Sequence, residues 1–92
     1  MKSIWKFPIS FNSKSVSVPK GTKFLSVQVQ TGQPVIWGLI DVESSYHVNA
    51  DVLILGTGWG VEEDYLKGLS FLGTIQLHNG LVFHFFVPEE MK

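Results

Sequence analysis

One short stretch, Gly56-Thr57-Gly58-Trp59-Gly60, contains three glycines and a tryptophan and directly follows an apolar run. Backbone N–H groups exposed by glycines can form a concave site for an anion. A tryptophan ring can stack on another flat ring, such as a nucleobase. We therefore predict that this stretch, here named the glycine loop, lines a pocket for a small nucleotide-like ligand. The alternative is a tight loop whose tryptophan covers the core, because glycine serves turns in most proteins.

The glycine loop matches no established nucleotide-binding fingerprint. It lacks the glycine spacing of a dinucleotide-binding loop and the Gly-Lys-Ser/Thr of a phosphate-binding loop. Glu62, Glu63 and Asp64 follow it and would repel a phosphate unless they turn outward. We expect a lysine from residues 1–23 to balance the charge of an anionic ligand.

Gln28 and Trp37 are further candidate ligand contacts, because a predicted β-hairpin places them on one face. Apolar Leu25 and Val27 alternate with polar residues in its first strand, and Thr31-Gly32 turns the chain into the second. The amide and the indole suit a small polar ligand or a protein interface. The alternative is an ordinary solvent-facing surface.

The residues around Asn79-Gly80 predict a second hairpin with a two-residue type I′ turn, because Asn and Gly both tolerate positive φ. This register places His84 on the face of Ile75, away from Thr74 and His78. The two histidines would then not share a metal, since the ligands of a metal must converge on one point. We expect His84 to be a core or interface histidine with one hydrogen bond, and we predict no metal site.

No catalytic group stands out in the sequence. Cysteine is absent, which excludes disulfides, thiolate metal sites and cysteine nucleophiles. Residues 68–73 do not form the Gly-x-Ser-x-Gly nucleophile elbow. The acidic residues at 62–64 lie in one local run, as is typical of a solvated helix face. We predict a protein without enzymatic activity and without a cofactor.

Composition predicts one small domain with an apolar surplus. The chain has 92 residues, of which 45% are hydrophobic and only 16% are charged, where about 25% charged is usual. The core of a single domain of this size cannot bury all of these apolar side chains, so some of them must lie on the surface. We therefore expect a homo-oligomer, most simply a dimer that buries part of residues 3–7 or 81–87.

The charged residues argue against a partner made of duplex nucleic acid. All seven basic side chains are lysines, and arginine is the residue best suited to phosphate and guanine contacts. No apolar run is long enough for a membrane span. The first ten residues also lack the apolar core of a signal peptide. We expect a cytoplasmic protein that contacts neither a membrane nor duplex nucleic acid.

Period-two patterns along the rest of the chain complete an all-β prediction. They indicate short strands at 3–7, 15–18 and 48–55, while residues 61–68 favour one or two helical turns. We predict a compact antiparallel sandwich or barrel of six to eight short strands with at most one short helix. Residues 1–92 form this single β domain.

Several segments together resemble a small family of proteins found mostly in bacteriophage genomes. They are IWKFPI, VPKGTKFLSVQVQ, IWGLID, GTG, FLGTIQ and LVFHFF, in this order along nearly the whole chain. The resemblance implies a phage origin and a compact β domain, and it implies no activity. Members of that family tend to carry a histidine after Gly-Thr-Gly, where this chain has Trp59.

A phage origin favours a role in counter-defence. Some small phage proteins are sponges, non-enzymatic oligomers that sequester the nucleotide signals of bacterial immunity. Our first hypothesis is such a sponge, acting in the cytoplasm of the infected bacterial host. The alternatives are a protein-binding inhibitor of a host defence enzyme and a minor phage structural or assembly protein.

Overall fold

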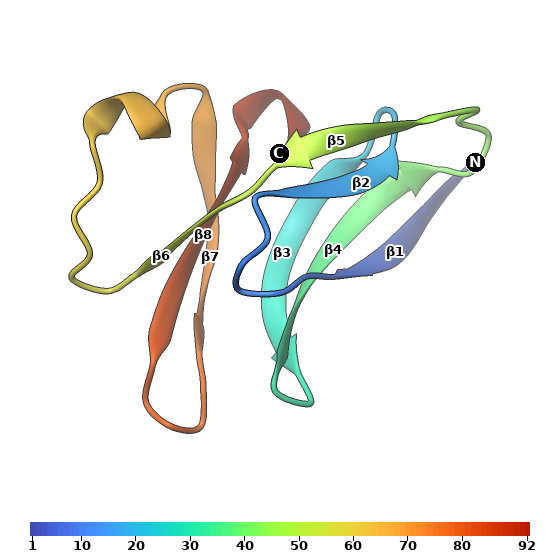
Figure 1. The fold of residues 1–92 in the computed structure, drawn as a ribbon. Helices are drawn as coiled ribbons and strands as arrows, with labels where there is room; N and C mark the ends of the chain where they lie inside the picture. Colours follow the sequence, from blue (N-terminus) through green and yellow to red (C-terminus); the bar gives the residue numbers. More distant parts are fainter.

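A computed structural model describes residues 1–92 as eight β-strands without an α-helix (Figure 1). The strands are β1 (Lys2–Pro8), β2 (Ser15–Pro19), β3 (Lys23–Gln30), β4 (Gln33–Asp41), β5 (His47–Asp51), β6 (Leu53–Gly56), β7 (Leu69–Gln76) and β8 (Val82–Pro88). Two short 3-10 turns, η1 (Glu63–Leu66) and η2 (Glu89–Met91), are its only helical elements. Neither is long and apolar enough to cross a membrane. The predicted all-β fold is confirmed.

The strands form three antiparallel sheets that do not close into a barrel. Their orders are β1-β4-β3, β2-β5 and β6-β8-β7. In Figure 1 the first and third sheets stand side by side, and the β2-β5 pair runs across one end of the first sheet. All three sheets contribute to one core, whose buried residues are Ile9, Val18, Phe24, Val27, Ile36, Ala50, Val52, Leu72, Ile75, Phe85 and Val87.

The first predicted hairpin is confirmed, with one local departure. Thr31 and Gly32 form its two-residue turn with φ values of 48° and 79°, as a type I′ turn requires. A β-bulge interrupts β3 between Phe24 and Ser26. The extra residue, Leu25, therefore points away from the core and is 47% exposed, while Phe24 is buried. The prediction that Leu25 shares the apolar face with Val27 is wrong, because simple alternation does not anticipate a bulge.

The second hairpin forms at the predicted place, but its register differs by one residue. Gly80 N–H donates to the carbonyl of Leu77 (2.9 Å), and Leu77 N–H donates to the carbonyl of Leu81 (2.8 Å). Only Gly80 has a positive φ, of 89°, so the loop has three residues and ends in a glycine bulge. The Asn79 side chain accepts the Leu81 N–H at 3.1 Å, which stabilises this longer loop. The predicted type I′ turn is therefore wrong.

The corrected register changes which side chains share a face of the third sheet. Thr74 pairs with His84, and Ile75 pairs with Phe83. Since Ile75 is buried in the core, His84 and Thr74 lie together on the opposite, outer face. The prediction that His84 lies on the face of Ile75 is wrong, because a one-residue slip moves every side chain of a strand to the other face.

The first and third sheets meet where β7 passes β3 at Gly73. A Cβ atom placed on Gly73 would lie 2.9 Å from Cγ1 of Val27 and within 4 Å of the Val27 backbone. Strand β7 carries its own bulge between Phe71 and Gly73, close to this crossing. The two backbones can approach this closely only because residue 73 has no side chain.

We expect Gly73→Ala to lower the free energy of unfolding by about 1–3 kcal/mol, because the new methyl group overlaps the buried Val27 side chain. Chemical denaturation followed by circular dichroism measures the change. Gly60→Ala is the matched control, since Gly60 has no neighbour within 4 Å of the added Cβ and no positive φ. Equal stability of the two variants would show that the crossing of β3 and β7 is not tightly packed.

Candidate functional site

The glycine loop begins as a tight turn at the end of β6. Trp59 N–H donates to the carbonyl of Gly56 (3.1 Å), and Gly58 adopts a φ of 87°. This geometry is a type II turn, whose third residue needs positive φ. Thr57 N–H donates to the carbonyl of Val82 in β8 (3.2 Å). Two of the N–H groups predicted to face an anion therefore already have carbonyl partners.

Trp59 lies on the surface, with its ring held from one side. The side chain is 62% exposed, so it does not cover the core as the alternative interpretation required. A Cβ on Gly56 would lie only 2.5 Å from the Trp59 ring, which shows that the indole packs directly on the Gly56 backbone. The ring of Phe83 meets the indole edge to face, with 6.0 Å between centroids and an interplanar angle of 84°. Such an arrangement is a favoured aromatic geometry.

An open groove of about 320 Å³ runs between the glycine loop and the hairpin that ends β7 and begins β8. We name it the Trp59 groove. Its lining residues are Gly56, Thr57, Trp59, Gly80, Leu81, Val82 and Phe83. They include one hydroxyl group and no charged side chain. The groove therefore offers aromatic and apolar walls without a charged side chain.

A chain of three side chains joins the glycine loop to the outer face of the third sheet. Thr57 Oγ1 is 2.7 Å from His84 Nε2, and Thr74 Oγ1 is 2.9 Å from His84 Nδ1. Both ring nitrogens of His84 are thus hydrogen bonded, so the expectation of a core or interface histidine with one hydrogen bond is wrong. A neutral imidazole donates from one nitrogen and accepts at the other. The glycine loop, β7 and β8 contribute one residue each, and together these tie the loop to the sheet.

The structure does not bring Gln28 and Trp37 to the glycine loop. Both lie on the outer face of the first sheet, where Ser26 pairs with Trp37 and Gln28 pairs with Val35. Their shared face is confirmed, but neither residue lines the Trp59 groove. Of the seven predicted site residues, only Gly56, Thr57 and Trp59 line the Trp59 groove.

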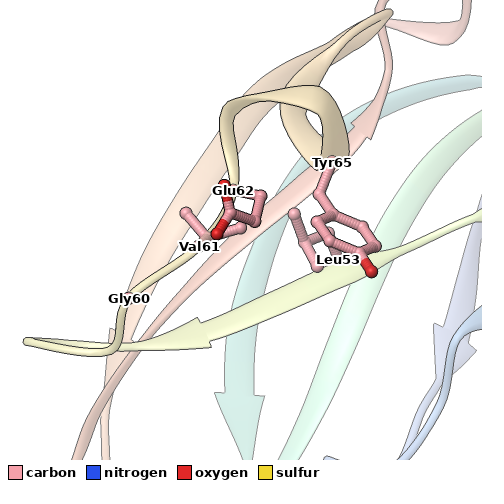
Figure 2. A pocket seen from close by; sticks show the side chains of 5 residues that line it. All are labelled: Leu53, Gly60, Val61, Glu62 and Tyr65. Atoms are coloured by element: carbon pink, nitrogen blue, oxygen red, sulfur yellow. The ribbon is translucent and has the colours of Figure 1, made fainter.

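A second hollow lies under the segment that crosses from β6 to β7. It has a volume of about 540 Å³ and is lined by Leu53, Gly60, Val61, Glu62 and Tyr65. Figure 2 shows the Tyr65 ring hanging from η1 beside Leu53 of β6. An adjoining hollow of about 360 Å³ shares these two residues and adds Lys14 and Lys67. Sequence patterns did not single out Tyr65, because the acidic residues before it predict a solvated helical turn.

The charged residues near the glycine loop gather at the hollows and not in the Trp59 groove. Lys14, one of the lysines expected to balance an anionic ligand, borders the adjoining hollow together with Asp51. Lys67 pairs with Asp64 at 3.2 Å, and Glu62 lines the hollow under the crossing segment. None of Glu62, Glu63 and Asp64 lines the Trp59 groove.

We expect Gly56→Ala to displace the Trp59 indole, because the added Cβ would overlap the ring. In a ¹H–¹⁵N correlation spectrum, the indole N–H signal of Trp59 should shift when the ring leaves Phe83. Trp59→Phe assigns the signal among the three tryptophans, and Gly60→Ala serves as the control that leaves it in place. An unchanged signal in Gly56→Ala would mean that the indole does not rest on Gly56.

Comparison with known proteins identifies a family for the chain. No curated protein and no solved structure matches it. One family model matches residues 1–92, from before β1 to beyond η2, and so includes the glycine loop. The family is described as a domain of unknown function (DUF7352), and by this match the chain belongs to it.

Proposed function

We propose that this protein is a non-enzymatic binding protein that sequesters a small nucleotide-derived signal. The observation that carries the proposal is the position of Trp59, which is 62% exposed and packs on Gly56 and Phe83 beside a groove. Stacking of a base on an aromatic side chain contributes about 1–3 kcal/mol. A ring that is already held in place loses little conformational freedom when a ligand stacks on it.

The resemblance to phage proteins supports a counter-defence setting for this activity. In that setting the protein is a sponge in the cytoplasm of the infected bacterial host. A sponge needs affinity for its signal but no reaction. The chemistry of the Trp59 groove fits that requirement, since none of its lining residues carries a charged side chain.

Exposed apolar side chains support self-association. The accessible surface is 5816 Å², against about 5,400 Å² for an average monomer of this mass. Ile4, Trp5 and Leu81 are between 44% and 60% exposed, and they lie within the segments 3–7 and 81–87 that we expect an oligomer to cover. We propose a homo-oligomer, most simply a dimer, that buries part of one of these segments.

The same exposed side chains favour one rival function, a protein-binding inhibitor of a host defence enzyme. Leu81 borders the Trp59 groove, and Phe71 is 47% exposed on the outer face of the third sheet. Aromatic residues are enriched in the centres of protein interfaces. A host enzyme inhibited in stoichiometric amounts by the parent protein, and not by Trp59→Ala, would favour this rival over the sponge.

We expect Trp59→Ala to weaken nucleotide binding by about tenfold to a hundredfold, the loss that corresponds to one base stack. The melting temperature should change little, because the ring is mostly exposed. Native mass spectrometry and calorimetry with a panel of cyclic and linear signalling nucleotides measure the binding. Trp5→Leu in β1 is the control that retains it. The sponge proposal fails if no nucleotide binds the parent protein or shifts its melting.

Light scattering at high micromolar concentration should give a mass that is a multiple of 10.3 kDa. Ile4→Lys or Leu81→Lys should shift that mass toward the monomer, because a charge in an apolar contact is costly to bury. The variant that dissociates identifies the segment at the interface. A parent protein that stays at 10.3 kDa would overturn the oligomer proposal.

A further inference from the structure

We infer that the Trp59 groove recognises the nucleobase of its ligand, as a neutral flat ring, and leaves the phosphate in solvent. This inference rests on the proposed function and names the part of the ligand that the groove selects. It differs from the expectation drawn from the glycines alone, in which backbone N–H groups bind the anionic part.

The groove is uncharged. None of its seven lining residues carries a charge, and Lys14 and Lys67 border a separate hollow. The N–H groups of Thr57 and Trp59 already donate to backbone carbonyls. A phosphate placed in the groove would lose water without gaining a cation, and that transfer is unfavourable. A neutral ring meets no such penalty.

The walls of the groove are aromatic and aliphatic. Trp59, Phe83, Leu81 and Val82 are among its lining residues. Aromatic and aliphatic side chains both gain from covering a flat, weakly polar ring.

Calorimetric titration of the parent protein with nucleosides, their 5′-monophosphates and inorganic phosphate tests the inference without any variant. The probes are adenosine, guanosine, cytidine and uridine. For the base that binds best, we expect nucleoside and monophosphate to differ by less than about threefold in Kd, and inorganic phosphate not to bind. The Kd should also stay constant between about 50 mM and about 500 mM salt, because no phosphate contact releases counterions.

The outcomes separate this inference from the proposed function. If monophosphates bind a hundredfold more tightly than nucleosides, with a Kd that rises steeply with salt, the groove selects phosphate. In that case the inference is wrong and the sponge proposal stands. If neither nucleosides nor any of the signalling nucleotides bind, the proposed function fails and the inference fails with it.

Discussion

The arrangement of this protein depends on one close approach, that of β7 to β3 at Gly73. The missing side chain lets the two backbones lie against each other, with Val27 occupying the space that a Cβ would fill. The bulge beside Gly73 sends Leu72 into the core, and Thr74 then points outward beside His84. The same contact that joins two sheets therefore also sets the orientation of a residue at the candidate site.

The candidate site takes its geometry from the third sheet and not from the glycine loop alone. The loop is fixed to β8 through the Thr57 N–H and through the Thr57 hydroxyl at His84. Gly56 and Phe83 then hold the Trp59 ring. Binding groups on a loop are effective when a rigid scaffold positions them. The glycines serve this positioning, since Gly58 allows the turn and Gly56 leaves room for the indole.

The distribution of charge gives the site its chemical character. Glu62, Asp51, Lys14 and Lys67 line the hollows at the crossing segment, beside Tyr65 and Leu53. The Trp59 groove receives none of them. The surface therefore has a neutral, aromatic groove next to charged hollows. The neutral groove is the part suited to a flat ligand ring.

Local patterns in the sequence determined the strands, the first hairpin and the place of the glycine loop. Alternation and the Thr31-Gly32 turn are properties of neighbouring residues, and they suffice for these features. Asn79-Gly80 is different, because this dipeptide suits both a two-residue turn and a three-residue loop with a glycine bulge. Each choice turns His84 to a different face. The observed one places Phe83 and Phe85 inward with Ile75, where they pack with residues distant in the sequence. Only the shared core could therefore place His84 beside Thr57 and Thr74, and leave Gln28 and Trp37 on another sheet.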